Sequence, residues 1–395
     1  MLAVFLSNEK LLGQFSVSFS YRKGDEYEKG MKKRVPSLEK FTQFPLVLIC
    51  EHEFISTISR KFPKLIALAF KALYLVVPIK YVLFLTNFIQ MWRLFGSHKV
   101  DLVHINNGGY PAAMSASAAA IAARLRGIKR IVYVVNNVAT PYSKPLRWYD
   151  YPVDLIVKRC VSVFVTGSEF AGKALKSVLG ESQTRWVKIH NGIKRRAIIE
   201  SSEEVALRLG LNTDRLRFGV VALFEERKGH IVLLKAVKEL VGQDKEVPLI
   251  LLEGHGVLKQ ELMQFVDDHS LQEHVLFIGD EANVFDFLNC LDLVILPSIR
   301  NEDFPNVILE AMSLGKPVIA TRVAGIPEQI TTDTGIIVPP GGVKQMADAI
   351  TFMMENESDR LQFGLNAIKR FDSSFEEGIS VDNYLKLYMN LLEGR

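Results

Sequence analysis

The chain has 395 residues, of which 48% are hydrophobic and 23% charged. These proportions exclude a disordered or collagen-like chain, and the length predicts two to three globular domains. The net charge is +4, but residues 1–190 contain 27 Lys and Arg against 12 Asp and Glu, so the rest is acidic. The basic half indicates an anionic partner, either nucleic acid or an acidic lipid surface, unless it is only a solvated face.

The three cysteines and the first residues bear on the compartment. Cys50, Cys160 and Cys290 are far apart and lie in apolar runs, which predicts buried, reduced thiols and an intracellular protein. The opening MLAVFLSNEKLLGQF has no basic leader and no small-residue cleavage site. We therefore interpret it as a first strand followed by a loop and not as a signal peptide.

The first half predicts an α/β domain. Apolar runs at 44–50, 100–105, 130–135, 162–168 and 185–192 indicate strands, and the alanine-rich residues 112–127 indicate a helix that packs closely on a sheet. Leu65–Ile89 is almost wholly apolar but contains two lysines and a proline. Three structures are possible for this stretch: buried core helices, an interfacial membrane contact or a true membrane span. The two lysines argue against a span.

The second half alternates strands with helices. Continuous apolar runs at 216–224, 247–254, 274–279, 291–298, 316–321 and 335–340 are separated by helical periodicity. Strands that are apolar throughout indicate a parallel sheet covered on both faces, hence a doubly wound, Rossmann-like domain. The predicted fold is two such domains, residues 1–195 and 196–375, followed by an amphipathic segment, residues 376–395, with Tyr384, Tyr388 and Leu391 on one face.

Two acids flank a predicted helix start in the second half. Pro305 suits the first helical position and Gly315 the residue after the last. The free amides near Asn306 and Val307 form an anion site. Glu302 precedes this helix and Glu310 lies just over one turn inside it, at the carboxyl end of a strand, where open α/β sheets bind ligands. Two solvated surface acids are the alternative.

Two other turns favour an anionic ligand. Lys228 opens a helix, where a cation is unfavourable unless an anion binds beside it. Gly325 lies in a strand-to-helix turn, where backbone amides can approach a ligand. In the first half, VHINNGGYPAA (103–113) ends a strand with His104, Asn106 and Asn107. The asparagines are candidates for substrate contact, whereas His104 is either a proton shuttle or a hydrogen-bonded core histidine.

Several strings together resemble glycosyltransferase family 4, which has the GT-B architecture of two facing Rossmann-like domains. They are LFEERKGHIVLLKAV, LLEGHG, VLFIGD, LDLVILPSIRNEDFPNVILEAMSLGKPVIATRVAGIPEQI and GIIVPPGG, over roughly residues 215–345. VTGSEF and KIHNGI in the first half also fit. The resemblance implies that the last helix crosses back to the first, acceptor-binding domain and that the second domain binds a nucleotide sugar.

The resemblance also implies roles for residues. Glu310 would bind the ribose hydroxyls, Glu302 would lie near the transferred sugar and Lys228 would neutralise the leaving diphosphate. The backbone of Phe304, Pro305, Asn306 and Val307 would hold the sugar and diphosphate, and Gly279 would lie by the base. The family retains anomeric configuration and needs no metal; no metal ligands and no cofactor besides the donor substrate are expected, and the sequence has no D-x-D pair.

The sequence departs from the family at three places. Leu223 stands where an arginine is common, and Arg227 is the candidate substitute. Asn136 or Asn137 stands where a histidine is common, and an amide cannot act as a base. The glycine-rich loop after the first strand is reduced to Gly13. These changes favour an unusual acceptor.

The sequence therefore predicts a retaining, metal-independent glycosyltransferase that uses a nucleotide diphosphate sugar and a glycan or lipid-linked acceptor in cell-surface polysaccharide synthesis. A GT-B sugar-nucleotide epimerase and a non-catalytic binding relative are the alternatives. We expect a cytoplasmic protein, with peripheral contact to an anionic membrane suggested by residues 61–93 and the basic half. No nucleic-acid partner is expected, because the clusters KKR (32–34) and KRR (194–196) lack interleaved aromatic residues.

Overall fold

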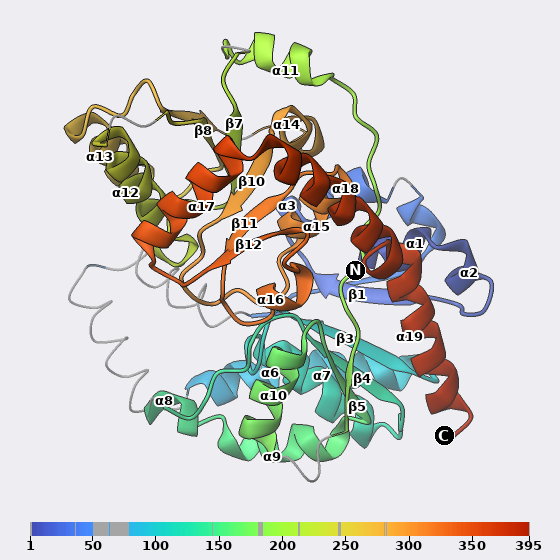
Figure 1. Ribbon diagram of the computed structural model, residues 1–395. Coiled ribbons are helices and arrows are strands. Elements are labelled where there is room, and N and C mark those ends of the chain that lie inside the picture. Colours follow the sequence, from blue (N-terminus) through green and yellow to red (C-terminus); the bar gives the residue numbers. More distant parts are fainter. Residues whose placement is uncertain are drawn as a thin grey trace. The chain divides into compact units, whose positions relative to one another are not determined.

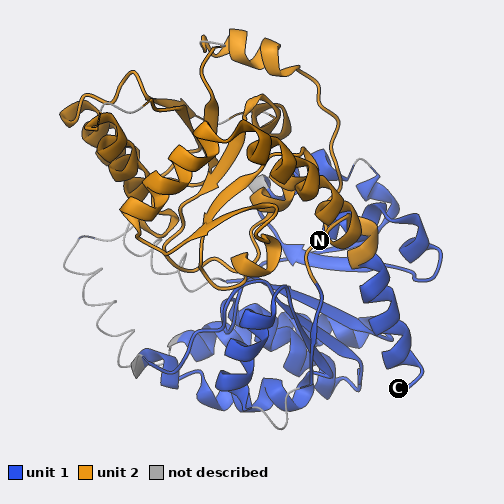
Figure 2. Ribbon diagram, in the orientation of Figure 1, with its two compact units in different colours: residues 1–189, 381–395 blue, residues 190–380 orange. Residues whose placement is uncertain are grey.

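The computed structural model describes residues 2–35, 37–49, 63, 79–143, 145–180, 185–211, 214–243, 246–279, 281 and 283–394. The chain forms two compact units: residues 1–189 with 381–395 make unit 1, and residues 190–380 make unit 2 (Figure 2). The sequence placed these divisions at 195 and 375. Each unit is built around a parallel sheet, as the apolar strands predict.

Unit 2 contains a six-stranded parallel sheet in the order β12-β11-β10-β7-β8-β9 (Figure 1). Its strands are β7 (Arg217–Val221), β8 (Leu249–Glu253), β9 (Val275–Gly279), β10 (Leu293–Leu296), β11 (Val318–Thr321) and β12 (Gly335–Val338). Read from β9, this is the 3-2-1-4-5-6 order of the doubly wound fold. The order reverses between β7 and β10, so the loops that follow these two strands are neighbours at the ligand-binding edge.

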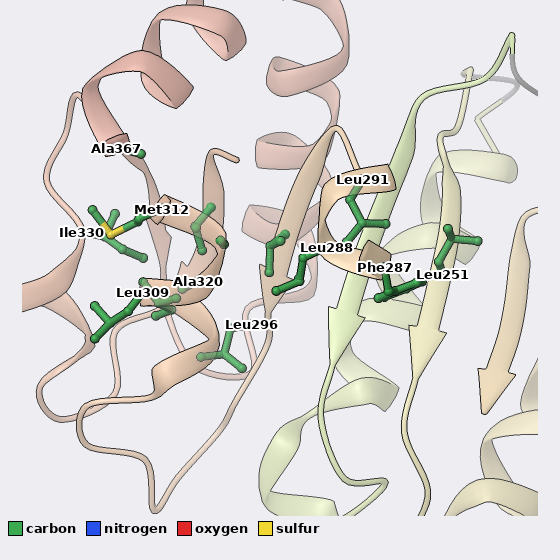
Figure 3. Packing of buried hydrophobic residues seen from close by; sticks show 14 of the residues in the cluster. Leu251, Phe287, Leu288, Leu291, Leu296, Leu309, Met312, Ala320, Ile330 and Ala367 are labelled. Carbon is green, nitrogen blue, oxygen red and sulfur yellow. The ribbon is translucent and has the colours of Figure 1, made fainter. Parts of the chain in front are cut away.

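Alternating side chains divide the unit 2 core into two layers. In β8, Leu249 and Leu251 enter one layer, whereas Ile250 and Leu252 enter the other. Figure 3 shows the first layer, in which residues of the strands pack against those of helices on one side of the sheet. The helices that contribute to this first layer are α11 (Ser202–Arg208), α14 (Val284–Cys290), α15 (Asn306–Ser313), α16 (Ile326–Gln329) and α18 (Glu357–Ser374). Those of the second layer are α12 (His230–Val241), α13 (Lys259–Asp268) and α17 (Val343–Glu355).

Unit 1 contains a four-stranded parallel sheet in the order β3-β4-β5-β6. The strands are β3 (Val103–Asn107), β4 (Ile131–Val135), β5 (Val163–Thr166) and β6 (Trp186–Lys188). One face is packed by α6 (Ile79–Ser97), α7 (Met114–Leu125), α9 (Tyr151–Cys160) and α10 (Glu169–Leu179). In α7, Ala118, Ala120, Ala122 and Ala123 are completely buried, which confirms the predicted close packing of the alanine-rich helix.

The other face of this sheet is covered from both ends of the chain. The last helix, α19 (Glu377–Leu392), buries Tyr384, Tyr388 and Leu391 against Val132, Val134 and their neighbours. The predicted amphipathic face is therefore the face that docks. Phe5 and Leu11 from the amino terminus complete the same cluster.

The predicted first strand within residues 1–15 is wrong, because these residues form two helices, α1 (Leu2–Ser7) and α2 (Glu9–Leu12). The side chain of Asn8 caps α2 by accepting a hydrogen bond from Leu11 N at 3.0 Å. A separate two-stranded parallel sheet follows, made of β1 (Ser18–Arg22) and β2 (Thr42–Leu46). Between them lie α3 (Asp25–Arg34) and the 3₁₀ turn η1 (Leu38–Lys40). The predicted strand 44–50 thus starts earlier and ends at Leu46.

Two further expectations have partial outcomes. Cys160 and Cys290 are buried free thiols, as predicted, and Cys50 lies outside the described residues. Of the apolar stretch Leu65–Ile89, only the part from Ile79 onward is described, as the beginning of α6. Within the part of the chain that the structure describes, no helix combines the length and the apolar character that a membrane crossing requires.

Candidate functional site

Lys228 and Glu302 meet at the point where the strand order of unit 2 reverses. Lys228 ends the 3₁₀ turn η3 (Glu226–Lys228) in the loop after β7, and Glu302 lies in the loop after β10. Their side chains form an ion pair through Lys228 Nζ and Glu302 Oε2, and each is only 12% exposed. The two residues that the sequence assigned to one site are therefore in direct contact.

Other donors converge on the same oxygen of Glu302. Arg227 Nη1 lies 3.4 Å from Oε2, and Ser298 Oγ donates to it at 3.2 Å. Arg227 also pairs with Glu225, at 2.8 Å. Arg227, the candidate substitute for the missing arginine, thus belongs to this cluster. All three contacts use Oε2, and none of them involves Oε1, the second oxygen of the Glu302 carboxylate.

The backbones of the two loops are locked together beneath this cluster. Ile299 N donates to Arg227 O at 2.8 Å. Gly229 has a φ of +70°, and a Cβ at this position would fall 2.0 Å from Pro297 O. On the opposite loop Asn301 has a φ of +53°, in the left-handed region that asparagine tolerates. Asn301 directly precedes Glu302, so the backbone conformation of this turn positions the Glu302 side chain.

The helix start that the sequence predicted is α15, with one correction. Pro305 is the N-cap, with a ψ of 130°, and the first helical residue is Asn306. No side chain caps this helix start, so its first amides have no intrahelical partner and no capping group. The Phe304 side chain is 5% exposed and stacks on His190, with ring centroids 4.8 Å apart. Phe304 therefore anchors the loop through its ring, and its carbonyl accepts a hydrogen bond from Asn191 Nδ2 at 3.4 Å.

Glu310 is a half-buried acid whose carboxylate has no hydrogen-bond donor among the described residues. It lies in the second turn of α15, where burial raises the pKa of its carboxyl group and the charge of Arg196 acts in the opposite direction. Ser313 Oγ donates to the backbone carbonyl of Glu310 at 2.7 Å, and among the described residues no hydrogen bond to the Glu310 carboxylate is found. Buried carboxylates are costly unless donors satisfy them. Hydroxyl groups of a ligand would supply such donors.

The two predicted glycines have different surroundings. Gly279 ends β9 with a φ of +88°, and its carbonyl accepts a hydrogen bond from Gly254 N at 2.9 Å. The residue after it lies outside the described part. Gly325 is the N-cap of α16 with an ordinary φ of −83°, and the left-handed residue of this turn is Ala324 instead. Gln329 of α16 donates to Pro305 O at 3.0 Å, which ties this turn to the start of α15.

In unit 1 the three predicted residues of β3 have separate environments. His104 Nδ1 bonds to Tyr388 Oη at 2.7 Å, and burial lowers the pKa of His104 to about 3. This placement favours the core-histidine alternative. Asn107 is buried, and its amide bonds to Tyr133 Oη, Pro111 O and Ala113 N. Asn106 is exposed and accepts from Asn136 Nδ2 at 2.8 Å, so these two amides form the polar surface at this strand end.

Sequence reasoning missed three residues that shape the site: Ser298, Arg196 and Gln329. Ser298 is completely buried two residues past the end of β10, and its only sequence signal is that position. The contacts of Arg196 and Gln329 link segments far apart in the sequence, so no local pattern could show them. Within the described ranges, no group of three or more His, Cys, Asp or Glu side chains is arranged to hold a metal ion.

Comparison with known families finds a match in each half of the chain. Residues 201–370 match the model for glycosyl transferases group 1, and residues 55–196 match the model for glycosyltransferase family 4. The chain belongs to glycosyltransferase family 4. The family resemblance read from the sequence is thereby confirmed.

Individual relatives extend over different parts of this chain. This chain is 28% identical over 225 residues to the putative glycosyltransferase EpsF of Bacillus subtilis. The match covers 55% of this chain and 57% of the relative. This chain is 26% identical over 332 residues to the capsular polysaccharide biosynthesis glycosyltransferase CapM of Staphylococcus aureus. That match covers 80% of this chain and 85% of CapM. The match to the N-acetyl-alpha-D-glucosaminyl L-malate synthase of Bacillus anthracis, 34% identical, covers 36% and 38%. Apart from CapM, the matches thus span about half or less of these relatives.

Solved structures show the same fold. A glycosyltransferase from Rickettsia africae superimposes with a TM-score of 0.75 at 17% identity, covering 100% of this chain and 94% of that one. HepE from Anabaena, in complex with UDP, superimposes with a TM-score of 0.70 at 18% identity, covering 94% and 91%. The family and these neighbours give the chain the predicted GT-B fold of two Rossmann-like domains.

Glu310→Gln should stabilise the ligand-free protein at neutral pH. Because burial raises the pKa of Glu310 in the folded state, the ionised carboxylate costs stability once the pH exceeds its unfolded value near 4.5. The cost grows as the pH rises through the folded pKa and is absent below the unfolded one. Thermal unfolding across this pH range should therefore show a Tm gain for the variant at pH 7 that disappears in acid. The matched control, exposed Glu261→Gln, should show no gain; equal behaviour of both variants would contradict a buried charge at 310.

Gly229→Ala should destabilise unit 2 more than Gly341→Ala. Both glycines have a similar positive φ, +70° and +74°, and the left-handed conformation alone costs about 1–2 kcal/mol with a side chain. Only at Gly229 does a Cβ meet a carbonyl oxygen, while nothing lies within 4 Å of one at Gly341. Chemical denaturation of the two variants measures the difference. Equal losses of unfolding free energy would mean that the two loops are not locked at Gly229.

Proposed function

We propose that the chain is a retaining glycosyltransferase that moves a sugar from a nucleotide diphosphate sugar to a glycan or lipid-linked acceptor, in cell-surface polysaccharide synthesis. The observation that carries the proposal is the convergence of Lys228 and Glu302 from the two loops at the strand reversal, beside the uncapped start of α15. The names of CapM and of the UDP-bound neighbour HepE support the same chemistry and the same kind of donor.

Each group has a task that fits its surroundings. As the bond between the anomeric carbon and the diphosphate breaks, negative charge grows on the diphosphate. Lys228, Arg227 and the amides of α15 supply positive charge there, which is why we propose that the reaction needs no metal cofactor. Glu310 receives the ribose hydroxyls, and the unused Oε1 of Glu302 accepts from the transferred sugar. The acceptor oxygen then bonds to the anomeric carbon on the face that the diphosphate leaves, and its proton passes to an oxygen of the departing diphosphate.

The ion pair also compensates the charge of Lys228 when no donor substrate is bound. An isolated ammonium at 12% exposure would be costly, and Glu302 compensates that charge in the absence of a donor. Two cations, Arg227 and Lys228, and two acids, Glu225 and Glu302, make the cluster neutral. An arriving diphosphate adds acceptors for both cations.

Lys228→Ala should lower the rate of sugar transfer by roughly a hundredfold or more, because one preorganised donor to the diphosphate is worth on the order of 3 kcal/mol. Glu310→Gln should abolish tight donor binding while the protein stays folded. Product analysis with a panel of nucleotide sugars and thermal shifts with the same panel provide the two readouts. The control is Lys235→Ala, an exposed lysine on α12.

Two results would contradict the assignment. Full activity in both Lys228→Ala and Glu310→Gln would remove these residues from the site. Conversion of the donor to an isomeric nucleotide sugar without any acceptor would instead identify an epimerase.

We also propose that unit 1 makes peripheral contact with an anionic membrane at the inner face. The exposed side chains of α6 include Val82, Leu85 and Ile89, which are 60%, 53% and 40% exposed. Their spacing puts them on one face of the helix, and Arg93 continues that face with a positive charge. An apolar face next to basic residues is typical of interfacial helices.

The protein should therefore float with phosphatidylglycerol vesicles at low salt and less so at high salt. Leu85→Glu should weaken flotation, because it places a carboxylate on the apolar face of α6. The exposed alanine-helix position Leu125, 61% exposed on α7, offers the control Leu125→Glu. Absence of flotation of the unchanged protein at low salt would refute the membrane contact.

A further inference from the structure

Three aromatic rings form a partly exposed cluster in unit 1, after the carboxyl end of β4. Tyr142, Trp148 and Tyr151 have centroid separations of 5.1 Å for Tyr142–Trp148, 5.7 Å for Tyr142–Tyr151 and 6.0 Å for Trp148–Tyr151. Trp148 is 57% exposed and Tyr151 is 43% exposed. We name these three residues the aromatic platform. They come from the connection between β4 and α9, which includes the short helix α8 (Pro145–Trp148).

Buried charges hold the platform from beneath. Arg147 and Asp154 are 6% and 2% exposed, and Arg147 Nη2 lies 2.6 Å from Asp154 Oδ2. Tyr142 Oη donates to the same carboxylate oxygen at 2.5 Å. The Arg147 guanidinium carbon lies 4.3 Å from the centroid of the Tyr142 ring. The tyrosine is therefore fixed both at its hydroxyl and across its face.

The network also fixes the connection that carries the platform. Arg147 Nε donates to Thr140 O at 3.1 Å, and Arg147 Nη1 lies 3.3 Å from Asp150 Oδ2. Asp150 in turn pairs with Lys80 of α6 at 2.8 Å. Burying an arginine and an aspartate costs several kcal/mol per ion before their attraction repays it. In this segment the network holds the Tyr142 ring and the backbone that carries Trp148 and Tyr151, whose side chains are largely exposed.

The position and rigidity of the platform favour a ligand of fixed shape. Ligands of open parallel sheets bind beyond the carboxyl ends of the strands, which is where this connection begins. Preorganised side chains bind more tightly because less conformational freedom is lost on association. A bilayer, by contrast, adapts to any ring geometry and gains little from rings locked by buried charges.

We propose that the aromatic platform is a subsite for a sugar ring of the glycan acceptor. The faces of aromatic rings carry negative partial charge, which attracts the C–H groups on the apolar face of a pyranose. The exposed ring of Trp148 offers that surface, while the sugar hydroxyls remain in water. Its place as an acceptor subsite rests on the proposed function, whereas sugar binding to the platform can be tested without it.

The test follows the three tryptophans, Trp92, Trp148 and Trp186, by fluorine NMR after incorporation of 5-fluorotryptophan into the full chain. Trp148→Phe assigns the Trp148 resonance. Soluble oligosaccharides of glucose, galactose, mannose and N-acetylglucosamine are added at millimolar concentrations. At least one should shift the Trp148 resonance and leave the Trp92 resonance unchanged. Tyr151→Ala should weaken that sugar's binding about tenfold, which corresponds to the 1.4 kcal/mol scale of one aromatic contact.

The control and the opposing outcomes separate this site from the donor site. Tyr27→Ala removes a similarly exposed aromatic ring, 46%, that stacks on Tyr21, and should leave the sugar affinity unchanged. A Trp148 resonance that no oligosaccharide moves, or that only phosphatidylglycerol vesicles move, overturns the proposal. Trp148→Ala should keep donor binding and lose transfer to the glycan. If the unchanged protein binds no nucleotide sugar at all, the proposed function is refuted. The oligosaccharide titration of the platform remains a valid test in that case.

Discussion

The candidate site depends on the contact between the loops after β7 and β10. These strands are adjacent because the sheet order reverses between them, so two connections separated by more than seventy residues must share the same space. Gly229 lets one backbone approach Pro297 O, and the Ile299–Arg227 hydrogen bond closes the approach. The pairing of Lys228 with Glu302 follows from that closure. A side chain at Gly229 would push the loops apart and separate the two charges.

Several features of the site lower the stability of the ligand-free protein, and a bound ligand would reduce their cost. Glu310 is half-buried and has no donor among the described residues, α15 begins without a side-chain cap, and Asn301 occupies a left-handed conformation. Each costs stability in the ligand-free protein. The two core layers of unit 2 stabilise the fold and offset these costs. This distribution, a well-packed scaffold with unmet polar groups at one edge, is the expected physical basis of a binding site.

Unit 1 distributes its polar groups differently. Asn107, a predicted substrate contact, and His104, for which a proton shuttle and a core histidine were both open, have hydrogen bonds to Tyr133 and Tyr388 inside the unit. The more costly buried groups, Arg147 and Asp154, lie under exposed rings instead. Asn136, one of the two asparagines proposed to stand where the family commonly has a histidine, bonds to Asn106 and the backbone of Asn107. The strand ends of unit 1 thus present amides and aromatic rings and use no imidazole in these places.

The sequence by itself determined the parallel sheets, because strands buried on both faces must be apolar throughout and the helices between them must be amphipathic. It also determined the start of α15 to within one residue, since Pro305 and Gly315 restrict the backbone locally. The amino-terminal helices were missed because short apolar runs suit either a strand or a helix. The Asn8 side chain caps the second of them, α2.

Only the tertiary structure decided which polar groups meet. Lys228, Arg227 and Ser298 all contact Glu302 across two connections, and Arg147 and Asp154 together hold the Tyr142 ring of the platform. Such partners depend on strand order and on long-range packing, whereas sequence periodicity reports only which face of each element is buried.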